Sequence, residues 1–327
     1  MILPIDVNPL IRCYRIHAYV MNILGLADSN FEQYVLSNYL CLHNGKDGIR
    51  REYLDFHLDN NYLNILDVFR NNKWFDIVQI HDLNSENYIN KKESKDNIIH
   101  FLNQGYYILH NVNEYYLPHA SAYGQYIDNN IAMTYGYDEK KDNFLLLDYN
   151  RNGHFGSSAV PSKDYFRAIS AVTVTNRLNF IKAKKNLSWK FDNKKALNLL
   201  SCHIQSENAY SDHDDFKNNI FGYEGVERTL KELQSSGMNM IRIRVIKEHK
   251  DVVLKYMQYI VENGFTDNAE YYEAYKVICS NMNKIFMRIL KKILCNNGRD
   301  FTCEIDAIRK LNESESELLQ RFLSYFI

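Results

Sequence analysis

The sequence predicts an α+β domain followed by an all-α domain, and three observations carry this prediction. Residues up to about 180 change from apolar spacings of three and four to runs rich in aromatic and β-branched residues. Later segments keep spacings of three and four almost throughout. A basic, polar stretch, KAKKNLSWKFDNKK, separates the two parts. We therefore expect N-terminal helices packed on an antiparallel sheet in residues 1–182, and a helical accessory domain in residues 183–327.

Three helices are expected before the sheet. Apolar residues at Ile16, Val20, Ile23 and Leu24 predict a helix that ends at Gly25. The segments YLNILDVFRNN and SKDNIIHFLNQG predict the second and third helices. The third is expected to stop at Gly105, because glycine readily adopts the left-handed conformation that follows many helices.

Four strands are expected next. YYILHNVNEYYL is rich in aromatic and β-branched residues and ends before Pro118. NIAMTYGYD and DNFLLLDYN follow, with EKKD between them as a polar hairpin loop, and AVTVTNRLNF is the fourth run. Helices followed by such neighbouring strands indicate an α+β domain.

Five helices are expected in the second half. Their apolar spacing is clear in KKALNLLSCHI, GYEGVERTLKELQSS, EHKDVVLKYMQYIVENG, EYYEAYKVICSNMNKIFMRILKKILCNNG and ESESELLQRFLSYFI. SESE is interpreted as an N-terminal cap with acidic residues in the first turn. The charges of EHKD, residues 248–251, are expected to lie on a solvent-exposed face.

Composition limits the classes of function. The 327 residues carry a formal net charge of −1, so binding to nucleic acid is not expected. No stretch is long and apolar enough to span a membrane, and the N-terminus lacks the pattern of a signal peptide. The six cysteines show no metal-ligand spacing, so neither a metal nor a disulfide scaffold is expected. We expect a cytoplasmic protein without a cofactor.

Cys13 is the first candidate for chemistry, within NPLIRCYRIHAYVMNILGL. A helix N-terminus lowers the pKa of a cysteine thiol, because free backbone N–H groups stabilise the thiolate. The alternative is an ordinary buried cysteine in a core helix, which is the commoner case. His17 lies one helical turn further on and is expected to be a packing residue, since a base on the same helix would point along the core face.

A cysteine nucleophile needs a histidine base and a group that orients it. The sheet region offers His110, His119 and His154. Its acidic candidates are Asp128, Asp138 and Asp148, of which Asp148 ends an apolar strand. Taken singly, His119 reads as a solvated loop histidine and Asp148 as a turn cap.

The order of motifs resembles one family over nearly the whole chain. CYRIHAYVMNILG, NVNEYYLPHASAYG, IAMTYGYDEKKDNFLLLDYN, FGYEGVERTL and RVIKEHKDVVLKYMQYI together are similar to the acyltransferase BtrH of the butirosin pathway and its relatives beside nonribosomal peptide assembly lines. The resemblance implies a papain-like cysteine-protease fold followed by a helical domain. It also implies transfer of an acyl group from a carrier-protein phosphopantetheine thioester to a small amine or diamine in antibiotic biosynthesis, polythioamide assembly included.

Within this resemblance Cys13 matches the nucleophile and Asp148 the orienting acid. The family's histidine is expected before YGYD, where this chain has Asn129 and Asn130. We assign the base to His119, because Pro118 fixes its approach and its strand should neighbour the one that ends at Asp148.

The oxyanion is expected to bind the backbone N–H of Cys13 together with Asn8. Tyr115, Tyr116 and Tyr135 are expected to line a channel for the acyl group. Two alternatives stay open: a papain-like peptidase or thioesterase with water as acceptor, and a non-catalytic binding protein that keeps the fold.

Overall fold

The computed structural model divides the chain into two compact units. The first contains Met1–Ser29 and Asn64–Leu187, and the second contains Asn30–Leu63 and Ser188–Ile327. Within them the structure describes residues 1–46, 52–58, 74–80, 91–172, 178–210, 218–295 and 300–326. The helix expected in YLNILDVFRNN, residues 62–72, lies outside the described residues.

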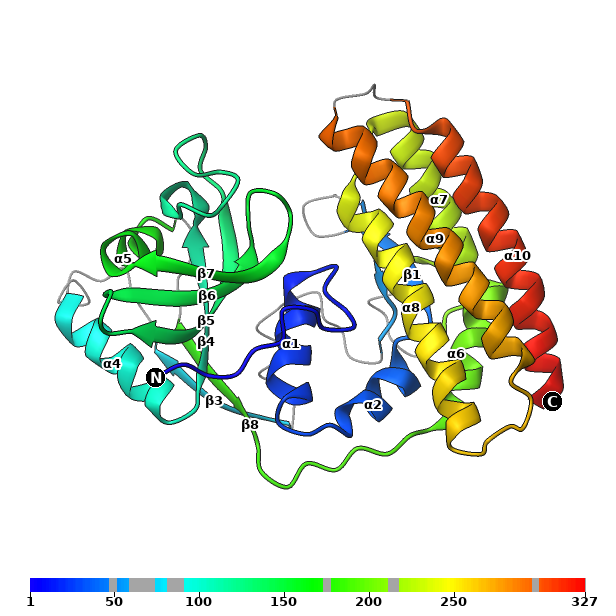
Figure 1. The fold of residues 1–327 in the computed structure, drawn as a ribbon, viewed down its shortest axis with the longest axis horizontal. Coiled ribbons are helices and arrows are strands. Elements are labelled where there is room, and N and C mark those ends of the chain that lie inside the picture. The colour runs from blue at the N-terminus through cyan, green and yellow to red at the C-terminus, as the bar shows by residue number, and fades with distance from the viewer. Residues whose placement is uncertain are drawn as a thin grey trace. The chain divides into compact units, whose positions relative to one another are not determined.

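A six-stranded antiparallel sheet forms the first unit, in the order β3-β8-β4-β5-β6-β7 (Figure 1). Strands β5 and β6 match two of the expected runs, and β4 occupies only the first part of YYILHNVNEYYL. Strand β8 shares only LNF with AVTVTNRLNF, whose residues 173–177 lie outside the described residues. The sheet gains two further strands at its edges. The bounds are β3 Phe75–Ile80, β4 Tyr107–Asn113, β5 Asn129–Asp138, β6 Asn143–Tyr149, β7 Phe155–Pro161 and β8 Leu178–Ala183. Both β4 and β5 are mostly buried, as the apolar runs predict.

Helices α1 (Arg15–Gly25), α4 (Lys91–Asn103) and α5 (Ser162–Ser170) belong to this unit. The apolar spacing correctly predicted α1, which contacts β5 and β8 through a buried face. Gly105 follows α4 with φ of +84°, a left-handed conformation that glycine adopts without steric cost. The α+β class with an antiparallel sheet is therefore confirmed.

The second unit holds a three-stranded antiparallel sheet, β2-β1-β9, beside its helices. The second unit is therefore not all-α, which corrects the expectation of a purely helical domain. The bounds are α2 Phe31–Asn38, β1 Leu42–Lys46, β2 Glu52–Phe56, α6 Asn193–Gln205, β9 Ile220–Phe221, α7 Gly222–Ser236, α8 Met240–Glu262, α9 Glu270–Leu294 and α10 Thr302–Phe326.

Residues 30–63 join the second unit through contacts far along the chain, so one boundary at residue 182 does not describe the division. Strand β1 pairs with β9, and Asn44 Nδ2 donates to Thr229 Oγ1 at 2.9 Å. The backbone N–H of Leu42 donates to His203 Nδ1 at 3.3 Å. Each partner is more than 150 positions away, which is why local patterns did not reveal the exchange.

Two charged segments of the second unit contain buried residues. One had been expected on a solvent-exposed face and the other at the start of a helix. Glu248, His249 and Lys250 of EHKD are buried on α8, which corrects the expectation of a solvated face. SESE lies inside α10, not at its start, and Glu315 is fully buried. Lys250 Nζ donates to Glu315 Oε2 and, at 2.9 Å, to Asn312 Oδ1. Burial is tolerated because the two charges neutralise each other.

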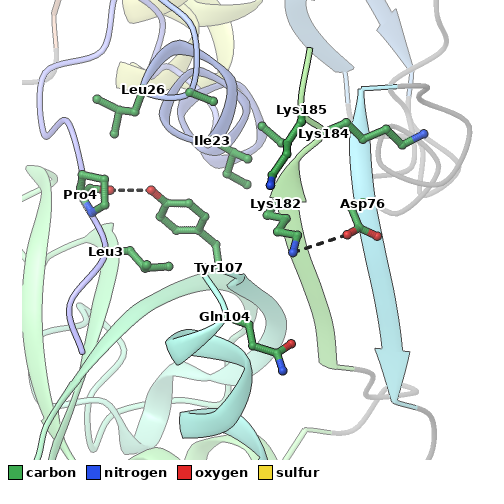
Figure 2. Close-up of a pocket in the computed structure, with 13 residues that line it drawn as sticks. Leu3, Pro4, Ile23, Leu26, Asp76, Gln104, Tyr107, Lys182, Lys184 and Lys185 are labelled. Carbon is green, nitrogen blue, oxygen red and sulfur yellow. Dashed lines mark hydrogen bonds and ion pairs between the residues drawn. The ribbon is translucent and has the colours of Figure 1, made fainter. Parts of the chain in front are cut away.

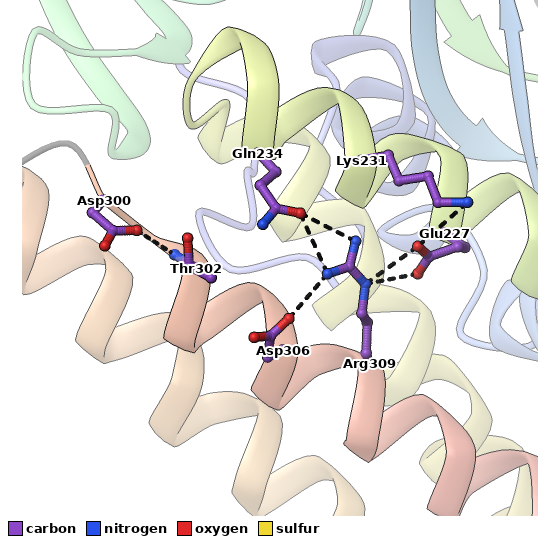
Figure 3. Close-up of polar contacts among 7 residues, drawn as sticks. All are labelled: Glu227, Lys231, Gln234, Asp300, Thr302, Asp306 and Arg309. Atoms are coloured by element: carbon purple, nitrogen blue, oxygen red, sulfur yellow. Dashed lines mark hydrogen bonds and ion pairs between the residues drawn. The ribbon is translucent and has the colours of Figure 1, made fainter.

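Side chains also join α7 to α10 at the surface of the helical unit (Figure 3). Arg309 Nε donates to both carboxylate oxygens of Glu227, at 3.2 and 3.0 Å, and Arg309 Nη1 donates to Asp306 at 3.0 Å. The single Nε–H is shared between the two oxygens of Glu227, so this is a bifurcated contact, and as a partly exposed ion pair it adds little to the packing of the two helices.

Candidate active site

The N-terminal end of α1 gathers segments from distant parts of the first unit. Cys13 lies two residues before the first residue of α1, and Arg15 is that first residue. The Tyr149 hydroxyl, at the end of β6, donates to the carbonyl oxygen of Arg12. The N–H of Arg151 donates to the carbonyl oxygen of His119 at 2.7 Å. These contacts bring the loop after β4 and the end of β6 to the start of α1.

Arg15 holds two buried carboxylates at this end of the helix. Its Nε donates to Asp148 Oδ1 at 2.5 Å, and its Nη2 donates to Glu114 Oε1 at 2.6 Å. Burial lowers the pKa of Arg15, but the carboxylates of Asp148 and Glu114 more than offset it, so the pKa is raised. The guanidinium therefore stays charged and anchors both acids.

Glu114 begins the short 3₁₀ helix η2 (Glu114–Tyr116) directly after β4. Burial raises the pKa of its carboxyl to about 7, and the nearby Asp148 adds to the rise while Arg15 opposes it. Glu114 can therefore hold or release a proton near neutral pH.

Asp148 is buried in β6, with a relative exposure of 1%. Its Oδ1 accepts from Arg15 and from the N–H of Tyr149, the latter at 2.7 Å. Its Oδ2 is buried and makes no hydrogen bond with any residue that the structure describes. A buried carboxylate oxygen without a donor is costly, so this atom is exceptional in a folded protein.

His119 has the complementary property. Both of its ring nitrogens are buried, and neither makes a hydrogen bond within the described part of the chain. Burial lowers the pKa of His119, and the charge of Asp148 opposes this effect. The imidazole is therefore neutral near pH 7, which is the form that accepts a proton.

The loop of His119 is tied to the strand end that carries Asp148. Besides the bond to the His119 carbonyl, Arg151 Nη2 donates to the carbonyl oxygen of Pro118 at 2.5 Å. His119 and Asp148, whose buried polar atoms have no hydrogen-bond partner within the described residues, thus belong to backbone segments that are hydrogen-bonded to each other through Arg151.

Cys13 is buried, with a relative exposure of 1%. No side chain caps the first turn of α1, whose N-cap residue is Tyr14. The first N–H groups of a helix have no partner within the helix, and they carry partial positive charge. A thiolate or an oxyanion at these N–H groups would be stabilised.

The other predicted residues have separate surroundings. Asn8 is exposed, and its Oδ1 accepts from Arg12 at 2.6 Å. Tyr135 is buried on β5, and its hydroxyl lies 2.5 Å from Ser157 Oγ. Tyr115 and Tyr116 are half-buried in η2, and Arg167 stacks over Tyr116 with its guanidinium 4.4 Å from the ring centre. These contacts give each side chain a local partner.

Three other histidines of the first unit have different surroundings from those of His119. His17 is buried in α1, as expected for a packing residue. His110 Nε2 lies 2.9 Å from Thr134 Oγ1 and 3.0 Å from the Tyr165 hydroxyl, and burial lowers its pKa to about 4. His154 is exposed between β6 and β7. Asn129 and Asn130 begin β5, where the resemblance led us to expect a histidine.

Sequence reasoning missed Arg15 and Glu114. Arg15 stands in the apolar stretch that begins α1, and a single charge in such a stretch could have indicated a buried ion pair. Glu114 directly follows a buried strand, where a carboxylate is unusual.

Among the described residues, no group of three or more histidine, cysteine or acidic side chains could hold a metal ion. Nor does any described helix combine the length and apolarity needed to cross a membrane.

No protein-family model matches this chain, and no curated protein is detectably similar to it.

Proposed function

We propose that the first unit is a papain-like acyltransferase related to the BtrH family. In this proposal an acyl group passes from a carrier-protein thioester to Cys13 and then to an amine, forming an amide in the biosynthesis of a nonribosomal peptide-like antibiotic. The observation that carries the proposal is that three buried polar atoms, both ring nitrogens of His119 and Oδ2 of Asp148, have no hydrogen-bond partner among the described residues. Core packing alone gives no reason to keep them.

The arrangement of elements supports a papain-like fold. A helix begins just after the candidate nucleophile, and the candidate base and acid come from segments that border the antiparallel sheet. In cysteine-dependent acyl transfer, the base must approach the thiol and the acid must orient the base. The anchoring of Asp148 by Arg15 leaves one carboxylate oxygen for that purpose.

The first half-reaction moves the acyl group to the protein. His119 takes the proton of the Cys13 thiol, and the sulfur attacks the thioester carbonyl to form a tetrahedral oxyanion. N–H groups of the first turn of α1 stabilise that oxyanion. Collapse breaks the carbon–sulfur bond to the carrier, and His119 returns the proton to the departing carrier thiolate.

The second half-reaction releases the amide. The amine attacks the acyl-Cys13 carbonyl while His119 accepts a proton from its nitrogen. The bond to Cys13 then breaks, and His119 returns the proton to the sulfur. The thioester supplies the driving force, so the exchange requires no nucleotide.

Intact-mass spectrometry tests the proposal directly. The full chain is incubated with the benzoyl thioester of N-acetylcysteamine, a small mimic of the carrier arm. We expect one benzoyl adduct on the wild type and its loss in Cys13→Ala. Cys295 and Cys303 are exposed, so Cys295→Ala and Cys303→Ala control for adventitious acylation of surface thiols. An adduct of equal yield in Cys13→Ala would contradict the proposal.

A chase with 1,3-diaminopropane separates the transferase from a hydrolase. The transferase predicts benzoyl amide as the product, whereas a peptidase or thioesterase that uses water predicts benzoic acid with and without the amine. Nucleophile, base and acid are the same in both cases, so only the product distinguishes them.

The burial of Cys13 favours a second candidate, a non-catalytic binding protein. Reactive cysteines are usually at least partly exposed, and β5 begins with Asn129 in place of the expected histidine. This candidate predicts no adduct on any variant, together with unchanged pathway output when Cys13 and His119 are both replaced by alanine.

A further inference from the structure

A cavity of about 550 Å³ lies in the first unit, at the opposite end of α1 from Cys13. Its walls come from the N-terminal segment, the end of α1 and the neighbouring ends of β4 and β8 (Figure 2). Leu3, Ile23, Leu26 and Tyr107 supply apolar surface. The cavity shares no lining residue with the candidate active site, so it calls for a separate explanation.

Two hydrogen bonds to backbone carbonyl oxygens hold the apolar wall in place. The N–H of Leu3 donates to the carbonyl oxygen of Tyr135 at 2.9 Å. The Tyr107 hydroxyl donates to the carbonyl oxygen of Pro4 at 2.7 Å. Burial raises the pKa of Tyr107 to about 12, so this donor keeps its proton at neutral pH. The wall is therefore preformed, as is usual for ligand pockets.

Glycine at position 136 permits this arrangement. Ile2 forms a bridge with Gly136 of β5, and a Cβ there would lie 3.2 Å from the Cα of Ile2. A larger residue would push the N-terminal segment away from the sheet, and with it the wall made by Leu3 and Pro4.

The opposite wall is positively charged. Lys182, Lys184 and Lys185 line it, with Asp76 as the acidic residue among the lining residues. Lys182 lies 3.7 Å from Asp76 and 4.0 Å from the ring centre of Tyr106. Lys185 makes no ion pair with any described residue, and its amine turns toward Lys182, whereas the side chain of Lys184 runs away across β3 (Figure 2).

We propose that this cavity binds an anionic amphiphile, a carboxylate with a short hydrocarbon chain. The carboxylate pairs with the ammonium groups of Lys182 and Lys185, and the chain covers Leu3 and Leu26. The volume falls within the range of small-molecule sites, and apolar walls with a few placed charges are their usual composition. An anion would give Lys185 a partner and Lys182 a second one beside Asp76, whereas a neutral chain would offer neither lysine a charge.

The proposal stands apart from acyl transfer, because none of its residues touches Cys13, His119 or Asp148 in any contact described above. Its test is therefore a binding measurement and needs no turnover.

Isothermal titration calorimetry of the full chain with sodium octanoate tests the site. We expect one octanoate per chain, and a dissociation constant at least about tenfold higher in Lys182→Ala/Lys185→Ala, because each lost charged contact weakens binding substantially. Lys140 and Lys141 are exposed on the β5–β6 hairpin, so Lys140→Ala/Lys141→Ala is the matched control and should bind as the wild type does.

Two further ligands test separately how the charged wall and the apolar wall contribute to octanoate binding. Acetate should bind at least tenfold more weakly than octanoate, since it lacks the chain, and octanol should do so because it lacks the charge. The variant Leu26→Ser, which changes a residue that is 44% exposed and so should fold, should also weaken octanoate binding. The proposal is overturned if octanoate does not bind the wild type, if octanol binds equally well, or if the double lysine variant binds unchanged.

Discussion

Arg15 Nε donates to Asp148 Oδ1 at 2.5 Å, while Oδ2 of the same carboxylate is buried without a hydrogen bond to any described residue. Asp148 Oδ1 is thus paired with the guanidinium of Arg15, whereas Oδ2 has no described donor. His119 has ring nitrogens that are also unpartnered within the described residues, and the charge of Asp148 raises the pKa of its imidazole against the effect of burial. The site therefore combines the Arg15–Asp148 ion pair with polar atoms of Asp148 and His119 that have no described hydrogen-bond partner.

Arg15 should be essential for the stability of the first unit. Replacement by glutamine leaves the buried carboxylates of Asp148 and Glu114 without their cation, and removing one partner of a buried ion pair costs about 3–5 kcal/mol. Urea unfolding followed by circular dichroism measures the loss. Lys95→Gln breaks the more exposed pair with Asp142 and should cost about 1 kcal/mol or less. Equal losses in the two variants would contradict this account.

Glu114 should give the first unit a distinctive pH dependence. Burial raises its pKa to about 7 from the usual 4.5, so between these values the folded state binds more protons than the unfolded state. The free energy of unfolding then decreases as pH rises through this window. Glu114→Gln, which cannot titrate, should lack this contribution, so the stability of the wild type relative to the variant should fall between pH 5 and pH 8. A difference that stays constant with pH would show that Glu114 is ionised throughout.

His119 should matter for chemistry and not for folding. His119→Phe removes two buried nitrogens that have no described partner, so stability should be unchanged or higher by about 1 kcal/mol. The rate of Cys13 acylation should nevertheless fall about a hundredfold or more if His119 is the base. As a control, His110→Phe removes the ring contacts to Thr134 and Tyr165, whose hydroxyls still lie 3.0 Å from each other, and should cost about 1 kcal/mol. Normal acylation by His119→Phe would remove His119 from the site.

The buried pair Lys250–Glu315 can be examined by a double-mutant cycle. Lys250→Met leaves Glu315 charged and buried, which should cost about 3–5 kcal/mol. Replacing both residues, as Lys250→Met with Glu315→Leu, should recover only part of that loss, because two apolar groups need no partner but the buried Tyr275 hydroxyl loses its acceptor Glu315. Thermal unfolding of the four proteins gives the coupling energy. Additive losses would mean that the two side chains do not interact across α8 and α10.

Local pattern was enough for most helices and for the central strands. The spacing in α1 and the apolar runs of β4, β5 and β6 are properties of neighbouring residues, so they are readable without tertiary information. The exchange of residues 30–63 into the second unit depends on β1 pairing with β9, about 175 positions away, and no local pattern encodes that pairing.

The same reasoning explains what was missed in the site. Cys13, His119 and Asp148 were candidates because their chemistry is visible in the residue type. Arg15 matters because Asp148 and Glu114 lie beside it, 133 and 99 positions further on, and such a relationship appears only in the fold. Glu315 was interpreted as part of a cap for the same reason, since its partner Lys250 is 65 positions away.

The reactivity of Cys13 tests the central claim most directly. The native chain is treated with iodoacetamide across pH 5 to 9, and peptide mass spectrometry gives separate alkylation rates for Cys13, Cys295 and Cys303. Cys13 is buried, so the account predicts slow alkylation of Cys13, with a rate near pH 6 that falls in His119→Phe while the rates of the exposed Cys295 and Cys303 stay unchanged, because His119 promotes thiolate formation. A Cys13 that stays unlabelled in the native chain, or that reacts equally in His119→Phe, would contradict it.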